Sequence, residues 1–262
     1  MRIKPSWRLS VLRLLHEGRC ADVCTYARED VGTDSMIPIR DTIPARRTAS
    51  LVRAVVILNI GIFVWELFQG QALTRWIFRF GVTPASWTMT LPADLLEWPR
   101  LVMTLLTSQF LHGSLLHVAS NMLYLWIFGD NVEDRLGRGR FVFLYLGSGA
   151  VAALTQLAIH PTSAIPMIGA SGAIAGVLGA YFLLFPFSRI TTLVPLFFAW
   201  EFVELPAFVF LGFWFLLQWV QGIASVGVVT EVGSGIAWWA HVGGFVSGLI
   251  LTQLWRVRRH YF

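Results

Sequence analysis

Charged side chains are scarce in this chain. Asp, Glu, Lys and Arg together make up 13% of its 262 residues, whereas a soluble globular domain carries about 25%. Hydrophobic residues make up 56%, and the mean hydropathy is +0.64. This balance excludes an ordinary soluble domain, and the length leaves room for several membrane spans of about 20 residues each. We therefore predict an all-α, polytopic membrane protein.

Cysteine is almost absent, since Cys20 and Cys24 are the only two. With His16 they form the pattern H-x3-C-x3-C, which could align three ligands on one helical face. Zinc sites usually have tighter cysteine pairs and four ligands. The simpler interpretation is two free thiols in a reducing cytosolic segment. We predict no metal and no cofactor, and the role of the two thiols stays open.

A concentrated basic patch is also lacking. The net charge is only +5, and the arginines are scattered along the chain. Basic residues that flank membrane spans on the cytoplasmic side are enough to explain this excess. We therefore expect the lipid bilayer to be a partner and nucleic acid not to be one.

The first 50 residues contain few long apolar runs and have mixed charge. We predict a cytosolic tail over 1–50, because no small-residue cleavage site follows an early apolar core as in a signal peptide. Residues 1–35 are expected to be disordered or, alternatively, not translated, because Met36 opens the string MIPIRDTIPARRT like a natural start. The predicted organisation then continues with one six-span domain over 51–256 and a short cytosolic tail over 257–262.

Six apolar runs have the length of membrane-spanning helices. They cover residues 52–68, 114–128, 141–159, 168–185, 206–223 and 236–255. The loop from 69 to about 113 is long and rich in tryptophan and phenylalanine, so we expect it to lie partly in the membrane interface. A further run, 193–200, is too short to cross the membrane and is expected to lie along its surface.

The basic residues predict the orientation. With these spans, 17 of the 20 Lys and Arg residues fall on one side of the membrane, and three fall in the long first loop. The positive-inside rule then places both termini in the cytoplasm. A compact six-span chain with this bias is expected in a bacterial inner membrane.

Titratable groups inside lipid are costly and are functional by default. Beyond the first residue or two of each span, only Glu66, His117 and His241 qualify. Glu66 ends the first span and can reach the interface. His117 lies in the first turn of span two and His241 about five residues into span six, or roughly 7–8 Å along the helix.

A serine lies at the same predicted depth. Ser171 is in the first turn of span four, within the string GASG, and spans two, four and six all start on the outer side. Each of these residues alone also has a structural interpretation, as a helix cap or a bond between helices. The shared depth of a serine and two histidines favours nucleophilic acyl transfer. Asn121 follows His117 by four residues, so both can donate toward one point.

At these residues the sequence resembles the rhomboid family of intramembrane serine proteases. The matching strings are GASG around Ser171, AHVGGFVSG around His241, and HVASNMLYLWIFGDNVED from His117, and the resemblance extends over residues 37–254. It implies a six-helix rhomboid-like bundle in which Ser171 is the nucleophile and His241 is the general base. His117 and Asn121 would then line the oxyanion hole.

Four glycines are expected to allow close helix packing at the site, namely Gly169, Gly172, Gly244 and Gly248. The resemblance implies single-pass membrane proteins as substrates, cut within their transmembrane segments, and a site that opens to the extracytoplasmic side. It implies nothing about the oligomeric state. His112 lies near the predicted site mouth, and we interpret it as an interface residue.

Two positions depart from the family pattern. Some rhomboids carry a tyrosine one turn after the serine, where this chain has Ala175. Many have Trp-Arg in the first loop, where this chain has Trp98-Pro99-Arg100. Neither departure removes a catalytic group.

Two alternatives are kept. The first is an inactive rhomboid-like protein that binds membrane helices. The second is a small transporter, although that class places ionisable groups at the bilayer centre, and here they gather in one leaflet.

Overall fold

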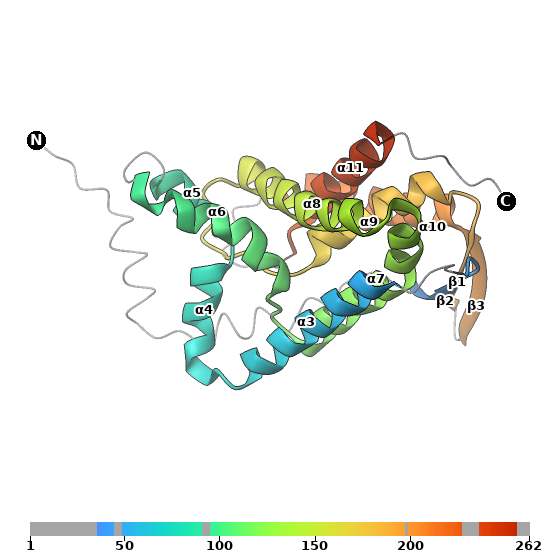
Figure 1. Cartoon of the computed structure of the whole chain (residues 1–262), viewed down its shortest axis with the longest axis horizontal. Helices are drawn as coiled ribbons and strands as arrows, with labels where there is room; N and C mark the ends of the chain where they lie inside the picture. Colours follow the sequence, from blue (N-terminus) through green and yellow to red (C-terminus); the bar gives the residue numbers. More distant parts are fainter. Residues whose placement is uncertain (1–35, 45–48, 91–94, 197–198, 227–235, 256–262) are drawn as a thin grey trace, which may run out of the picture.

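The computed structural model describes residues 36–44, 49–90, 95–196, 199–226 and 236–255. They form a bundle of α-helices with a small antiparallel sheet at one end (Figure 1). The predicted helical membrane bundle is confirmed, while the sheet is a feature that the sequence analysis did not predict. Of the predicted tail over 1–50, residues 37–41 form a strand of this sheet, whereas residues 1–35, Cys20 and Cys24 among them, lie outside the described residues, as does the predicted tail over 257–262.

Each of the six predicted spans coincides with a helix that starts within three residues of the predicted start. The helices are α3 (Ser50–Leu67), α7 (Leu115–Leu136), α8 (Arg138–Ile159), α9 (Ser171–Leu184), α10 (Ala207–Ser225) and α11 (Trp238–Leu254). By length and hydropathy alone, α3, α8 and α10 could cross a membrane. A bent pair that ends in α7 could make a fourth crossing, and α9 is a shorter apolar helix. The protein is therefore an integral membrane protein, and the count of six crossings stays a prediction.

The long first loop is largely helical. It contains α4 (Leu73–Phe80), α5 (Pro84–Thr90), α6 (Trp98–Thr107) and three short 3-10 helices, η1 (Gly70–Ala72), η2 (Leu95–Glu97) and η3 (Ser108–Phe110). The α6 and α7 helices meet at a bend of 83°. An isolated bridge between Val82 and Met167 ties this region to the segment that leads into α9.

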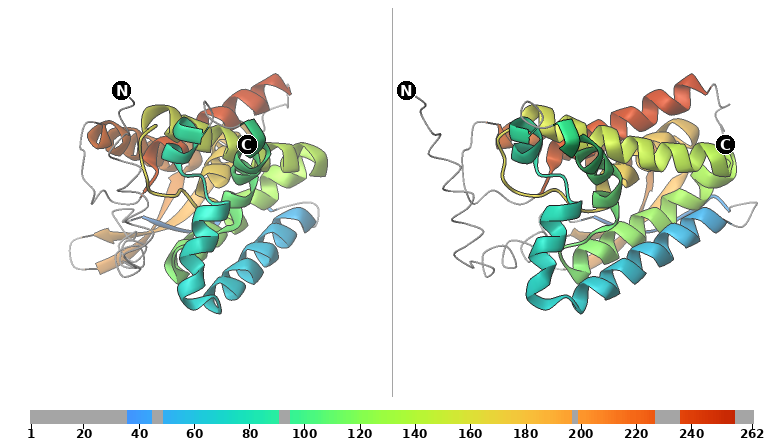
Figure 2. Two further views of the ribbon diagram at one scale, coloured as in Figure 1. Left: turned by 90° about the vertical axis from the view of Figure 1, so that its left-hand side faces the viewer. Right: turned by 60° about the vertical axis from the view of Figure 1, so that its left-hand side comes forward.

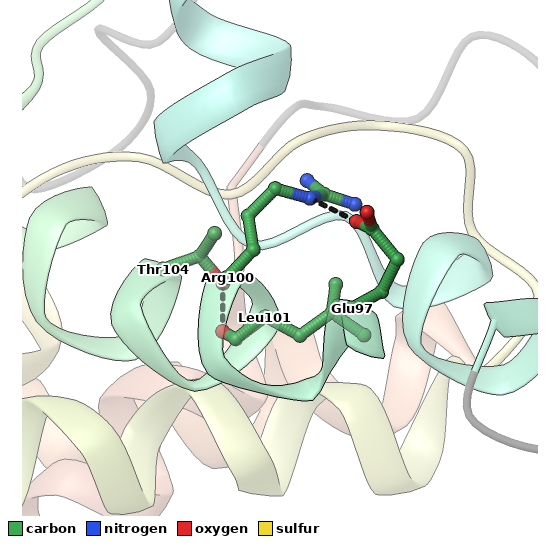
Figure 3. Close-up of polar contacts among 4 residues, drawn as sticks. All are labelled: Glu97, Arg100, Leu101 and Thr104. Carbon is green, nitrogen blue, oxygen red and sulfur yellow. Dashed lines mark hydrogen bonds and ion pairs between the residues drawn. The ribbon is translucent and has the colours of Figure 1, made fainter. Parts of the chain in front are cut away.

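The Trp98-Pro99-Arg100 string starts α6 instead of forming an irregular loop. Pro99 lies in the first turn, where proline is tolerated because its missing N–H would have no helical partner. The Arg100 side chain pairs with Glu97, and the Thr104 hydroxyl donates to the Leu101 carbonyl at 2.6 Å (Figure 3). These contacts are local and hold the first turns of α6 together.

α3 and α7 run side by side (Figure 2). The Ala49 cap residue of α3 supplies no side-chain bond. Instead the Glu133 carboxylate of α7 accepts from the backbone N–H groups of Leu51 and Val52, at 2.9–3.1 Å. A carboxylate at a helix N-terminus satisfies unpaired donors and interacts favourably with the helix dipole.

The α9 helix is the centre of the bundle. It is apolar on all sides and almost entirely buried, as expected for a helix surrounded by others. A Cβ built at Gly248 of α11 would lie 2.0 Å from the Gly176 carbonyl oxygen of α9. The two backbones can approach this closely only because neither residue has a side chain.

The sheet lies at the end of the bundle opposite α4–α6 (Figure 1). Its strands are β1 (Ile37–Asp41), β2 (Arg189–Leu196) and β3 (Ala199–Pro206), in the order β1-β2-β3 with antiparallel pairing. The described part of the run 193–200 pairs in the β2–β3 hairpin, and the prediction that this run lies along the membrane surface stays a prediction. The pairing in register joins Leu193 to Phe202 and to Ile37.

A cluster of hydrogen-bonded side chains ties β1 to the bundle. The Asp41 carboxylate accepts from the Tyr181 hydroxyl at 2.6 Å and from Nδ2 of Asn131 at 2.7 Å. The Tyr181 hydroxyl also contacts the Ser188 hydroxyl at 3.0 Å. Burial raises the pKa of the Asp41 carboxyl above its ordinary value, and the two hydrogen bonds oppose that rise. We call Asp41, Asn131, Tyr181 and Ser188 the anchor cluster.

Candidate active site

Ser171 is the first residue of α9. The segment before it turns sharply, because Gly169 has φ +122°, a conformation that side-chain-bearing residues rarely adopt. The Gly169 N–H donates to the Ser108 carbonyl of η3 at 2.9 Å, which fixes the entry into the helix. The first backbone N–H groups of α9 have no partner within the helix, so this end can receive negative charge.

His117 and Asn121 lie in the first turns of α7 and pack against the chain turn at Gly169. The Ser114 hydroxyl caps α7 by accepting from the His117 N–H at 3.1 Å. A Cβ built at Gly169 would lie 2.7 Å from Nε2 of His117 and 3.8 Å from Nδ2 of Asn121. Both side chains therefore lie against the residue two positions before Ser171, and a larger residue than Gly169 would not fit there.

Asn121 is 7% exposed, and its Nδ2 has no hydrogen-bond partner among the described residues. A buried amide donor without a partner costs about 1–3 kcal/mol. Other buried side-chain atoms of the described residues also lack a partner, so the position of this one carries the argument. Here it lies at the start of α9, where a ligand or substrate atom could accept from it.

The approach of α11 to α9 brings His241 to this end of the bundle. A Cβ at Gly244 would lie 2.1 Å from the Gly172 carbonyl oxygen, and a Cβ at Gly172 would lie 3.9 Å from the Ala240 carbonyl oxygen. The residue after Ser171 thus faces the residue before His241. Within the described residues no hydrogen bond joins Ser171 and His241. Such bonds are often long in the absence of substrate and tighten when it binds.

The surroundings of His241 come from α10 and from its own helix. Gln218 Oε1 lies 2.7 Å from Nδ1 of His241. The ring of Trp214 lies at a centroid distance of 5.9 Å, and that of Trp238 at 6.2 Å and perpendicular. Ala175, one turn after the serine, has only a methyl group where some rhomboids have a tyrosine. In this chain the side chains of Gln218, Trp214 and Trp238 surround the imidazole.

Gln218 was not among the predicted site residues. A glutamine does not titrate, so Gln218 does not stand out among the ionisable groups of the spans. The available signal was a lone amide inside the apolar string FWFLLQWV, where an unpaired polar group would be costly.

Buried polar groups also connect α3 to the site, through Glu66 and His112. The Glu66 carboxylate accepts from the His112 backbone N–H at 3.2–3.3 Å, and both residues are 1% exposed. The His112 ring packs edge-on against the His117 ring at 5.1 Å. The expectations that Glu66 reaches the interface and that His112 is an interface residue are therefore wrong. Glu66 is buried under the α6–α7 bend, and His112 supports the His117 ring.

No group of three His, Cys, Asp or Glu residues in the described part of the chain could hold a metal ion. The chemistry available is that of a serine hydroxyl, two imidazoles, two amides and the free N–H groups of a helix start. This set can carry out acyl transfer, in which a hydroxyl attacks a carbonyl and nearby donors receive the developing oxyanion.

Comparison with known proteins identifies the family of this chain. Residues 99–258 match the family model described as the Rhomboid domain. The chain is 28% identical over 213 residues to the mitochondrial Rhomboid protein 1 of Saccharomyces cerevisiae, covering 77% of this chain and 52% of that protein. It is 28% identical over 231 residues to RHOMBOID-like protein 1 of Arabidopsis thaliana, covering 80% and 54%.

A bacterial relative is more similar over a shorter region. The match to Rhomboid protease GluP of Bacillus subtilis is 43% identical over 118 residues, covering 45% of this chain and 21% of that protein. The chain thus spans about half, or less, of the length of these relatives. The family model covers more than half of the present chain, and the chain belongs to the rhomboid family of integral membrane proteins.

Proposed function

We propose that this protein is an intramembrane serine endopeptidase that cleaves transmembrane segments of single-pass membrane proteins. The observation that carries the proposal is the convergence of three helices at the start of α9. His117 and Asn121 of α7 lie against Gly169, two residues before Ser171, and the Gly172–Gly244 contact holds α11, which carries His241, against the start of α9. The name of the bacterial relative, a rhomboid protease, supports the same activity.

The first step is acylation of Ser171. The Ser171 hydroxyl attacks the carbonyl carbon of the scissile peptide bond while Nε2 of His241 takes the hydroxyl proton. The resulting tetrahedral intermediate carries a negative oxygen. The backbone N–H of Ser171 and the side chains of His117 and Asn121 donate to it. Collapse breaks the C–N bond, and the His241 imidazolium returns the proton to the leaving amine.

The second step is hydrolysis of the acyl-enzyme. Water attacks the ester carbonyl, His241 takes the proton of that water, and the same donors hold the second oxyanion. Collapse releases the new carboxyl terminus and returns the proton to Ser171. No Asp or Glu contacts His241 among the described residues, so Ser171 and His241 form a dyad with no acidic third member.

The fold limits what can reach the site. A helical peptide bond is shielded by its own hydrogen bonds and side chains, so a substrate helix must unwind where it is cut. Small or helix-breaking residues at the cleavage point are expected. The protein acts within the lipid bilayer, and the proposal requires no metal, cofactor or nucleic acid.

The proposed location is a bacterial inner membrane, with both termini in the cytoplasm and the site open to the extracytoplasmic side. The bias of 17 basic residues against three supports this orientation. Alkaline phosphatase, which is active only outside the cytoplasm, provides the test. Fusion to the C-terminus should give an inactive reporter, and an active one would reverse the proposed orientation.

The activity is tested by reconstitution. Wild type and Ser171→Ala are placed in liposomes with a single-pass membrane protein that has glycine and proline in its transmembrane segment. We expect wild type to release two fragments and Ser171→Ala to bind the same substrate without cutting it. Equal binding by both forms with no cleavage by wild type would favour the inactive rhomboid-like alternative.

A further inference from the structure

We infer that Gln218 is a positioning residue for His241, holding the imidazole in the one tautomer that can act as a base toward Ser171. This inference rests on the proposed function and extends it, because it adds a neutral third member to the proposed dyad. The observation is the 2.7 Å contact between Gln218 Oε1 and Nδ1 of His241. Gln218 is 1% exposed, so water does not compete for this contact.

Gln218 belongs to a stripe of α10 that packs on the start of α11. Trp214, Gln218 and Gly222 are spaced by four residues and therefore share one helical face. Trp214 packs against the His241 ring, and Gly222 accepts from Nε1 of Trp239 at 2.9 Å. A Cβ at Gly222 would lie 3.1 Å from the Trp239 ring. Contacts on both sides of Gln218 thus fix its distance to His241.

The amide oxygen of Gln218 determines which ring nitrogen of His241 carries the hydrogen. A glutamine Oε1 is only an acceptor, so Nδ1 of His241 must carry the hydrogen. Neutral imidazole carries one hydrogen, so Nε2 is left with a free lone pair. That lone pair is what a general base needs to take the Ser171 proton. The opposite tautomer would present an N–H to the serine and could not accept from it.

A neutral acceptor suits this position. A carboxylate here would be buried between two apolar helices, and its desolvation would be costly. An amide oxygen orients the ring without adding a permanent charge. When His241 becomes an imidazolium during acylation, Nδ1–H donates more strongly and the contact with Oε1 shortens, which favours the charged transition state.

The experiment compares rates of covalent labelling by a fluorescent fluorophosphonate, which needs no natural substrate. Purified wild type, Gln218→Leu, Gln218→Glu, Gln221→Leu and Ser171→Ala are compared in lipid nanodiscs. Gln221 is the matched control, since it is a partly buried glutamine on the same helix, and the hydrogen bond to the His241 ring comes from Gln218. Thermal unfolding of each variant is measured in parallel.

We expect Gln218→Leu to label about 100-fold more slowly, the upper end of the effect of residues that orient a catalytic or metal-binding group. Gln221→Leu should label within about twofold of wild type. Gln218→Glu keeps an acceptor toward Nδ1 and should recover to within about tenfold of wild type. A purely structural role for Gln218 predicts no such recovery, because a buried carboxylate would destabilise the helix pair further.

The tautomer is read directly by ¹⁵N NMR of histidine-labelled protein at a pH where imidazole is neutral, with the His241 signals assigned by their loss in His241→Ala. Wild type should show the hydrogen on Nδ1, and Gln218→Leu should lose that preference. A hydrogen on Nε2 in wild type overturns the inference, whatever the variants do. Labelling of Gln218→Leu at the wild-type rate overturns it as well.

Failure of the proposed function has a different outcome. If Ser171→Ala labels as fast as wild type, the nucleophile is wrong, yet the tautomer of His241 still tests the contact with Gln218. If Gln218→Leu does not fold, the wild-type spectrum and the Gln218→Glu rate still decide between the two interpretations.

Discussion

The buried polar groups near the two ends of α9 differ in whether they have hydrogen-bond partners. Near its end, the Tyr181 hydroxyl joins the anchor cluster, in which it is paired with Asp41 and Ser188. At its start, the buried amide of Asn121 lies against Gly169, two residues before Ser171, and has no partner among the described residues. The paired hydroxyl of Tyr181 and the unpaired amide of Asn121 thus lie at opposite ends of one helix.

Under the proposed function, the paired groups are structural and the unpaired Asn121 amide is functional. A buried polar group that is paired within the protein contributes to stability, whereas an unpaired one costs about 1–3 kcal/mol. Such a cost is expected where another molecule completes the pairing. Asn121 and Asn131 lie on the same helix α7 and show both cases, because Nδ2 of Asn131 donates to Asp41 and to the Ile43 carbonyl.

Replacing these two asparagines gives the largest predicted contrast. Asn121→Ala should reduce cleavage about 10²–10³-fold, the cost of losing one oxyanion donor, and should leave thermal stability unchanged or higher. Asn131→Ala should do the reverse, with cleavage near wild type and a free energy of unfolding lower by about 1–3 kcal/mol. Activity and thermal unfolding are measured on both. Equal loss of stability in the two variants would contradict the comparison.

The glycines between α9 and α11 give the next largest effect, on stability. Gly248→Ala puts a methyl group 2.0 Å from the Gly176 oxygen, so the helices must separate, and overpacking of this kind costs about 1–3 kcal/mol. Gly147→Ala on α8 is the matched control, because its Cβ would have no atom closer than 3.9 Å. It should be neutral or stabilising by about 0.5–1 kcal/mol. Unfolding in mild detergent measures both.

The tyrosine of the anchor cluster should show a smaller effect confined to stability. Tyr181→Phe removes two hydrogen bonds and leaves Asp41 with one donor fewer, at a cost of about 1–2 kcal/mol. Cleavage at a temperature where the variant is folded should match wild type. A large drop in the cleavage rate of folded protein would mean that the two ends of α9 are energetically linked.

The smallest predicted effect is a dependence of stability on pH at the anchor cluster. Burial raises the pKa of Asp41 above 3.8, so the folded state holds the proton more tightly than the unfolded state. This contribution to stability is present below 3.8 and is lost as pH rises through the folded pKa. Asp41→Asn should remove that loss. The melting temperature of wild type relative to Asp41→Asn should therefore fall from pH 4 to pH 7, and a rise would contradict the assigned direction.

The six helices at the predicted spans could be predicted from the sequence because each is a long apolar run bounded by glycine, proline or charge, whereas α4, α5 and α6 lie in a region that was predicted as a loop. The proposed site residues could be identified because a serine and two histidines stand out in such runs. The sheet could not be predicted, since β1 pairs with β2 about 150 residues later and the apolar run 193–200 has no alternation of polar and apolar residues. Gln218 could not be predicted as a site residue, because its proposed role depends on a contact between two helices that no local sequence pattern encodes.

The most direct test of the proposed protease site is the position of a covalent adduct. Wild-type protein in lipid is treated with a fluorophosphonate, digested and analysed by mass spectrometry, beside Ser171→Ala and His241→Ala. The account predicts an adduct on Ser171 in wild type and on no residue in either variant. An adduct on another residue, or equal labelling of wild type and Ser171→Ala, would contradict it.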